Sequence, residues 1–225
     1  EVYRIFVEGE LLETNSRTAE MAKLTENASR DVSIAFANEL SIISDKLDIN
    51  VWELIELANH HPRVNILQPG AGVGGHCIAV DPWFIVNQNP EEAKIIRAAR
   101  EINDNKPNWV VDKINAEVDK LQQQGVKKPT VALLGLAFKP DIDDLRESPA
   151  VHIAREMLDI SSAKILLVEP NINELPKSLT AGNLVDLDSA IEQADIVVIL
   201  VGHSQFKTVS LPEDKGVIDA VGITN

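Results

Sequence analysis

Four short apolar runs in the second half of the chain constrain its fold more than any other feature. Each run has the length of a strand and is rich in β-branched residues, and segments of helical character near 149–159 and 187–193 lie between them. Continuous apolar strands separated by helices are typical of a parallel sheet covered on both faces. The runs are TVALLGL (130–136), AKILLVEP (163–170), ADIVVILV (194–201) and GVIDAV (216–221). We therefore predict a doubly wound α/β domain over residues 126–225.

The first half of the chain, residues 1–125, is predicted to be helical. A segment without Gly or Pro and rich in Ala, Leu and Glu predicts a long helix over 16–47, with Ser16 as its N-cap. A second helix is predicted over about 51–58. Helical spacing returns over 90–124, where a proline at position 107 is expected to kink or split the helix because it lacks a backbone N–H group.

Composition excludes several classes of function. The formal net charge of −14 argues against nucleic-acid binding, which needs a clustered basic surface. The single cysteine excludes an intramolecular disulfide, and the chain contains neither zinc-type ligand spacing nor an apolar stretch of membrane-spanning length. With no signal peptide recognised at its start, we expect a cytoplasmic protein without a metal, a membrane partner or a nucleic-acid partner.

The single cysteine follows a cluster of glycines in PGAGVGGHCIAVDPWF, residues 69–84. Glycines permit a tight loop that could present Cys77 to a cleft, although a lone cysteine is more often a small buried apolar residue. Asp81 is expected to cap a helix that begins at Pro82, which is compatible with a catalytic role as well. His76 is a weak candidate for activating the thiol, because neighbouring side chains of an extended chain point apart.

A polar stripe lies on the first predicted helix. Lys23, Asn27 and Arg30 are spaced so that they share one face. A solvated stripe is the simpler interpretation, but the same face continues into Ile34 and Ala37, which suggests that protein covers it. A lysine buried there could act as a general acid or base, because desolvation lowers its pKa.

A third motif, GLAFKPDIDDLRES (135–148), follows the first predicted strand. In open α/β sheets, ligands bind at the carboxyl ends of strands, and Lys139 and Arg146 could meet a phosphate there. A structural turn with surface charges is the alternative. This motif is not the dinucleotide fingerprint G-x-G-x-x-G, which we take to be absent from the chain.

Taken together, SRTAEMAKLTEN, GVGGHCIAVDPWF and GLAFKPDIDDLRESPA resemble the UDP-glucose/GDP-mannose dehydrogenase superfamily. The phrases HPRVNILQPG, VEPNI and HSQF agree with it, and the resemblance extends from about residue 2 to 220 in family order. It implies an N-terminal Rossmann domain for NAD, a central helical dimerisation region and a C-terminal Rossmann-like domain that binds the nucleotide sugar. This chain corresponds to the last two, over 1–125 and 126–225.

The resemblance also implies a chemistry. Such enzymes oxidise the 6-hydroxyl of a UDP-sugar to a carboxylate with two NAD, and the motifs are nearest to members that act on UDP-N-acetyl-D-mannosamine. Cys77 is then the nucleophile that forms a thiohemiacetal and a thioester. By the same resemblance Lys23 transfers the proton, Asn27 binds the reacting oxygen or the hydrolytic water, and Asp81 helps to activate that water.

Binding residues carry over in the same way. Arg63 is implied to reach the neighbouring subunit of a homodimer, and Arg146 to touch NAD. Where the family has a basic residue in D-x-(Lys/Arg)-G, this chain has Val221. The implied substrate contacts are Lys23, Asn27, Arg30, His61, Arg63, Gly74, Phe138 and Lys139.

Two alternatives stay open at this point. The sugar could be another one, such as UDP-N-acetylglucosamine, or the chain could be a truncated, inactive module for dimerisation or nucleotide-sugar binding. In either case we expect residues 1–225 by themselves to form a two-fold dimer, to bind NAD very weakly and to produce no NADH.

Overall fold

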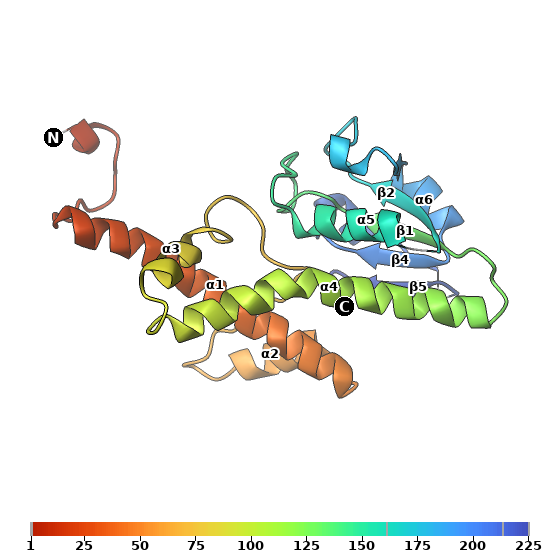
Figure 1. Ribbon diagram of the computed structural model, residues 1–225, viewed down its shortest axis with the longest axis horizontal. Helices are drawn as coiled ribbons and strands as arrows, with labels where there is room; N and C mark the ends of the chain where they lie inside the picture. The colour runs from red at the N-terminus through yellow and green to blue at the C-terminus, as the bar shows by residue number, and fades with distance from the viewer. Residues whose placement is uncertain (1, 161, 213, 225) are drawn as a thin grey trace.

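The computed structural model describes residues 2–160, 162–212 and 214–224. Within these ranges, a helical part built from α1 to α4 is followed by a sheet part (Figure 1). No described helix is both long enough and apolar enough to cross a membrane. Three short 3-10 turns complete the elements, at Val2–Ile5, Lys177–Leu179 and Ser204–Thr208.

The predicted parallel sheet is confirmed. In the described part of the chain it has five parallel strands in the order β3-β2-β1-β4-β5. Four of them coincide with the apolar runs, and the two-residue edge strand β3 was missed because so short a strand leaves no periodic signal. The strands are β1 Thr130–Leu134, β2 Lys164–Val168, β3 Asn183–Leu184, β4 Ile196–Ile199 and β5 Gly216–Asp219.

Helices cover both faces of the sheet, which explains why its central strands are apolar throughout. Alternate residues of β1 point to opposite faces: Val131 and Leu133 belong to one core cluster, and Ala132 and Leu134 to the other. The first cluster is completed by α4 and by α5 (Pro149–Ile160), and the second by α6 (Leu187–Gln193) and Phe206.

The helical part is arranged around α1 (Ser16–Lys46). The predicted second helix is confirmed as α2 (Val51–Asn59), and α3 (Asp81–Gln88) follows the glycine cluster. A small apolar cluster joins α1 to α3, through Ala28 on α1 and Ile85 and Val86 on α3. This contact places the beginning of α3, and the cysteine loop before it, beside α1.

The long helix α4 (Lys94–Gln123) belongs to both parts of the molecule. Its first half packs on α1, while Val110, Ile114 and Val118 pack under the sheet. Of the two outcomes predicted for Pro107, a kink or a split, the split is wrong, because α4 continues through this residue (Figure 1). Packing on both sides outweighs the loss of one backbone hydrogen bond. The division after residue 125 stays a proposal, since α4 packs on both parts.

Two predicted helix caps are corrected. The N-cap of α1 is Asn15, not Ser16, because the Asn15 Oδ1 atom accepts the Thr18 N–H group at 3.0 Å. Asp81 does not cap α3; it is the first helical residue, Val80 is the N-cap, and no side chain caps this end. The Asp81 carboxylate is therefore free for a different partner.

Candidate active site

The partner of Asp81 is Asn27 on α1. The Asn27 amide donates a hydrogen bond of 2.5 Å to the Asp81 Oδ2 atom, and Asn27 is buried between the helices. These two residues lie 54 positions apart in the sequence. The packing of α3 on α1 thus brings two of the proposed catalytic residues into direct contact.

Cys77 and Lys23 belong to the same cluster. The Cys77 carbonyl accepts the Val80 and Asp81 N–H groups at 3.1 and 2.8 Å, which forms the turn that leads the exposed thiol into α3. Lys23 precedes Asn27 on α1 by about one turn. The pKa of Lys23 is raised by its hydrogen bond and ion pair with Glu26, and further by the negative charges of Cys77 and Asp81.

For Lys23 the simpler of the two interpretations, a solvated stripe, is confirmed, and its pKa is not lowered by burial. Its side chain is 65% exposed, because the first turns of α1 have solvent around them. The Lys23 Nζ atom donates to the Glu26 Oε2 atom at 2.9 Å, about one turn before Asn27 on the same helix.

The glycine cluster packs directly against the third motif. A Cβ atom at Gly74 would lie only 2.3 Å from the Glu147 carbonyl oxygen and 3.2 Å from the Phe138 Cβ atom. The next residue, Gly75, has a φ of +86° and faces the Phe138 ring. Backbone this close to a neighbour can only be glycine. The cysteine loop and the loop 135–148 are therefore held together as one unit.

The spacing G-x-G-x-x-G, which we expected to be absent, is present as Gly70, Gly72 and Gly75. Its context is different from that of a dinucleotide fingerprint, which needs a preceding strand and an immediately following helix. Residues 61–69 contain no strand, and α3 begins only at Asp81. Two of these glycines serve close packing instead: Gly72 lies against Pro107 and Pro149, and Gly75 lies against the Phe138 ring.

A hollow of about 350 Å³ opens at the carboxyl end of the sheet, and we refer to it as the sheet-edge hollow. It is bordered by the ends of β1, β4 and β5 and by the glycine loop 70–72. Ring and backbone atoms of Phe138 and Gly202 line it, and Lys207 supplies a cation. Lys207 was missed in the sequence, although its place shortly after the β4 run was a usable signal.

The other basic residues of this edge lie differently. Lys139 is exposed and is not part of the lining of the hollow, whereas Val221 is part of it. Arg146 is exposed and forms a two-pronged ion pair with Asp144, at 2.9 and 2.7 Å. Hydrogen bonds from Arg146 hold the pKa of Asp144 well below its usual range. His76 approaches the same carboxylate at 3.8 Å.

Three proposed binding residues are not brought to the cysteine cluster within this chain. Arg30 is exposed on α1, and His61 and Arg63 are exposed in the loop that follows α2. The His61 Nδ1 atom accepts the Arg63 N–H group at 3.3 Å. Among the described residues, no hydrogen bond or ion pair joins any of the three to Cys77 or Asp81.

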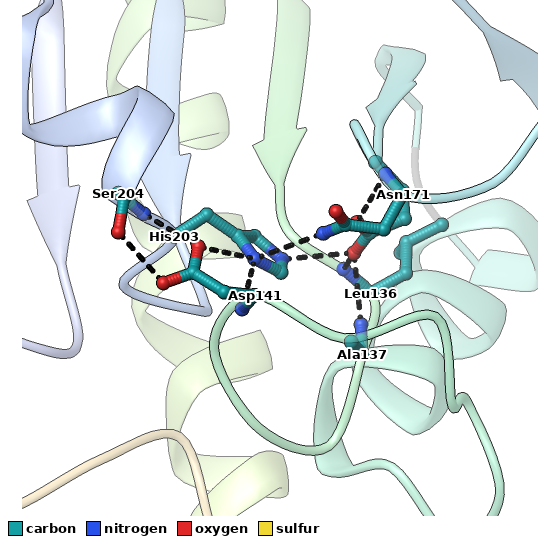
Figure 2. A network of polar contacts seen from close by, with 7 residues as sticks. Leu136, Ala137, Asp141, Asn171, His203 and Ser204 are labelled. Carbon is teal, nitrogen blue, oxygen red and sulfur yellow. Dashed lines mark hydrogen bonds and ion pairs between the residues drawn. The ribbon is translucent and has the colours of Figure 1, made fainter.

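The loop that follows β1 does not offer its first backbone N–H groups to a dinucleotide phosphate. In a dinucleotide fold, backbone N–H groups after the first strand face the ligand phosphates. Here the Leu136 and Ala137 N–H groups donate to the Glu169 carboxylate instead, at 2.7 and 3.0 Å (Figure 2). The described residues also contain no group of three His, Cys, Asp or Glu side chains that could hold a metal ion.

Two family models match the chain. The UDP-glucose/GDP-mannose dehydrogenase family, central domain, matches residues 17–105, and the UDP binding domain of the same family matches residues 132–225. The chain is 62% identical to UDP-N-acetyl-D-mannosamine dehydrogenase of Campylobacter jejuni, over 91% of this chain and 50% of the relative. The relative of the same name in Escherichia coli (strain K12) is 58% identical, over 99% of this chain and 54% of its own length.

Solved structures agree with these relatives. A UDP-D-ManNAc dehydrogenase from Pyrococcus horikoshii aligns with a TM-score of 0.84 and 38% identity, over 99% of this chain and 52% of that one. The UDP-N-acetyl-mannosamine dehydrogenase Cap5O from Staphylococcus aureus aligns at 0.79 and 41% identity, covering 99% and 56%. The chain thus spans about half the length of the relatives that it matches.

Proposed function

This chain belongs to the UDP-glucose/GDP-mannose dehydrogenase family, and from that premise we propose that it is the substrate-binding and thiol-bearing part of an NAD-dependent UDP-N-acetyl-D-mannosamine 6-dehydrogenase. The observation that carries this proposal is the hydrogen bond between Asn27 and Asp81 where α3 packs on α1, with Cys77 in the turn that leads into α3 and Lys23 one turn before Asn27. A nucleophile, a proton donor, an amide and a carboxylate are the groups that thioester chemistry needs.

In the proposed mechanism the Cys77 thiolate attacks the C6 carbon of the sugar aldehyde. A C–S bond forms, the carbonyl π electrons move to the oxygen, and the Lys23 ammonium gives that oxygen a proton. After oxidation to the thioester, a water molecule that gives its proton to Asp81 attacks the carbonyl carbon and releases the thiolate. Asn27 orients Asp81 through the hydrogen bond between them.

NAD is the proposed acceptor of both hydrides in the complete protein. This chain offers it Arg146, since the N–H groups that end β1 are occupied by Glu169. We place the remainder of the cofactor site outside residues 1–225.

The UDP part of the substrate is proposed to bind across residues 126–225 at the sheet-edge hollow. Phe138 offers a ring, Lys207 a cation and Lys139 a second cation at the rim. Gly74 keeps the cysteine loop close to this end of the sheet. The cation that the family places at the position of Val221 is replaced, in this proposal, by Lys207.

Residues 1–125 are proposed to form the dimer. His61 and Arg63 are exposed and are not joined to Cys77 within the chain. We assign them, together with Arg30, to the substrate site that is completed across the two-fold interface.

A second candidate keeps the chemistry and changes the sugar. A relative from Ralstonia solanacearum that is 54% identical over 99% of this chain is named NDP-N-acetyl-D-galactosaminuronic acid dehydrogenase. UDP-N-acetylglucosamine and UDP-N-acetylgalactosamine are therefore the competing ligands.

Calorimetric titration of the chain with the three UDP-N-acetylhexosamines tests the proposal. We expect UDP-N-acetylmannosamine to bind, and Lys207→Ala to weaken it roughly ten- to a hundredfold, because a charge-assisted contact to phosphate contributes about 1.5–3 kcal/mol. Lys139→Ala should weaken it as well, and Lys120→Ala, on the exposed end of α4, should not. Unchanged affinity in both Lys207→Ala and Lys139→Ala would refute the site, and tighter binding of another epimer would favour the second candidate.

A further inference from the structure

Three strand ends of the sheet converge on one buried polar network (Figure 2). Leu136 and Ala137 follow β1, Glu169 follows β2, and His203 follows β4. The Glu169 and His203 side chains are fully buried and lie 3.0 Å apart, from Oε2 to Nε2.

The Glu169 carboxylate accepts five hydrogen bonds. Its Oε2 atom receives the Leu136 N–H, the Ala137 N–H and the His203 Nε2–H groups, and its Oε1 atom receives the backbone N–H and the side-chain amide of Asn171. Burial raises the pKa of Glu169, but the hydrogen bonds from His203, Leu136 and Asn171 outweigh it and leave this pKa at about 2. The group is therefore a permanent anion inside the domain.

These contacts assign the tautomer of His203. The Asp141 backbone N–H group, which can only donate, lies 2.9 Å from His203 Nδ1, and the Asn171 amide lies 3.2 Å from the same atom. Nδ1 must therefore be the acceptor and Nε2 must carry the hydrogen that is donated to Glu169. The His203 ring is held in place by edge-on packing against Phe206, with 5.2 Å between the ring centroids.

Asp141 is a turn residue that needs such support. Its φ of 60° lies in the left-handed region, which costs free energy for a residue with a side chain. Its backbone N–H group is bound by His203, and its carboxylate accepts the N–H and hydroxyl groups of Ser204 at 2.8 and 2.6 Å. The conformation of this turn therefore depends on the segment that follows β4.

The same two segments both contribute to the lining of the sheet-edge hollow. Phe138 and Pro140, just before Asp141, line one part of it, and Val201 and Gly202, just before His203, line another. A hydrogen bond between Asp141 and His203 therefore ties the two parts together, with Lys139 on one segment and Lys207 on the other.

We propose that Glu169, His203 and the Asp141 turn form a positioning relay for the UDP-sugar site. Glu169 occupies the backbone N–H groups at which this kind of fold would otherwise bind a phosphate, so the ligand phosphates are directed to the Lys139 and Lys207 side of the loop. Glu169 also fixes the His203 tautomer, and the Nδ1 atom of His203 sets the turn that positions Phe138. This inference rests on the proposed function, and none of the three residues is required to touch the substrate.

Two substitutions of His203 separate positioning from stability. Asn places its amide oxygen near the Nδ1 position and can still accept the Asp141 N–H group, whereas Gln places its amide nitrogen near the Nε2 position and can donate only to Glu169. Both variants lose one buried contact. We expect His203→Gln to lose at least about tenfold in UDP-sugar affinity and His203→Asn to stay within about threefold of the original. Amide hydrogen exchange at Asp141 should accelerate in His203→Gln alone.

Met157→Ala is the matched control, because Met157 is a buried residue of α5 and packs on the opposite face of the sheet from Phe206. It should lower the melting temperature and leave the affinity unchanged. Equal affinities for His203→Asn and His203→Gln, or an equal loss in Met157→Ala, would overturn the relay. If the unmodified chain binds no UDP-sugar, the proposed function fails. The relay is then tested by amide hydrogen exchange at Asp141 alone. Faster exchange in His203→Gln than in His203→Asn supports the relay, and equal exchange contradicts it.

The internal anion has a test of its own. Glu169→Ala removes the carboxylate and leaves a small cavity in its place. The groups that donated hydrogen bonds to Glu169 then line this cavity, and formate is small enough to enter it. Formate, compared with chloride at equal ionic strength, should raise the melting temperature of Glu169→Ala by several degrees and leave Met157→Ala unchanged. Lack of a specific formate effect on a folded Glu169→Ala would contradict the anion role. If Glu169→Ala does not fold in chloride, recovery of the fold in formate supports this role, and no recovery contradicts it.

Discussion

At the scale of single residues, the candidate site depends on side chains that meet only after folding. Asp81 does not cap its own helix and contacts Asn27 instead, and the pKa of Lys23 is raised mainly by its hydrogen bond and ion pair with Glu26. The Cys77 thiol is exposed, and a cysteine thiolate is nucleophilic enough to add to the carbonyl carbon of an aldehyde.

This arrangement predicts the effect of replacing the thiol. In the protein that includes its NAD-binding part, Cys77→Ser should lower kcat by orders of magnitude, because a hydroxyl is a far weaker nucleophile than a thiolate at neutral pH. The affinity for the UDP-sugar, measured by calorimetry, should stay within about threefold, as it should for Cys77→Ala, because neither change removes a contact to phosphate. Near-normal carboxylate formation by Cys77→Ser would rule out the covalent mechanism.

At the scale of elements, the glycine loop is locked to the loop 135–148. Gly74→Ala would push a methyl group against the Glu147 carbonyl oxygen, so we expect a loss of about 1–3 kcal/mol in the free energy of unfolding. Denaturant titration measures it. Gly9→Ala is the control, because nothing lies within 4 Å of the added atom. Equal stability of the two variants would contradict a close contact between Gly74 and the Glu147 carbonyl oxygen.

The α1–α4 pair contains a second element-scale feature, a buried lysine. Lys106 is 2% exposed, donates to the Ser41 hydroxyl at 2.5 Å and lies 3.9 Å from the centre of the Trp109 ring. Burial lowers the pKa of Lys106 from 10.5 to about 7, although the charge of Asp45 opposes this. Between these two values the unfolded chain binds more protons than the folded one, so this group makes the free energy of unfolding rise with pH.

The prediction is a pH-dependent difference between the original chain and Lys106→Met. From pH 7 to 9, the free energy of unfolding of the original chain should rise relative to that of Lys106→Met, by at most about 1.4 kcal/mol per pH unit. Urea titrations at each pH measure it. Lys113→Met changes a partly exposed neighbouring lysine on α4 and keeps Lys106. Its free energy of unfolding should therefore run parallel to that of the original chain as the pH rises. Parallel curves for the original chain and Lys106→Met would show that the ammonium is not destabilised by burial.

At the scale of the whole molecule, the helical part leaves large apolar side chains uncovered. Phe36 and Ile43 on α1 and Leu57 on α2 are exposed. We predict that the chain forms a two-fold dimer through this surface, and that Phe36→Glu or Leu57→Glu dissociates it. Gel filtration with light scattering measures the mass. Val217→Glu, at an exposed apolar residue of β5, should leave the dimer intact, and a monomeric original chain would refute the prediction.

The same whole-molecule view predicts that residues 1–225 by themselves bind NAD very weakly and release no NADH at saturating UDP-N-acetylmannosamine. The sheet holds its own carboxylate where a dinucleotide phosphate would bind, and Arg146 offers a single contact, which is too little to order a dinucleotide. Sustained growth of the NADH absorbance would show that the cofactor site has been misplaced.

The sequence by itself determined the local elements. Apolar runs of strand length and helical spacing predicted four strands, the parallel sheet and the long helices, because these signals depend on residues close together in the chain. The motifs also indicated the family and the proposed catalytic residues through a resemblance. Periodicity could not predict the two-residue strand β3, the choice of Asn15 over Ser16 as a cap, or the uninterrupted passage of α4 through Pro107.

Only the tertiary structure decided which side chains meet. The Asn27–Asp81 hydrogen bond, the approach of Gly74 to Glu147 and the Glu169–His203 pair each join segments that are far apart in the sequence. Their geometry follows from how helices pack on one another and from the order of strands in the sheet. The pKa of Lys106 follows from the same source, since it is lowered by a burial that no local pattern encodes, whereas the pKa of Lys23 is raised mainly by Glu26, three residues away on the same helix.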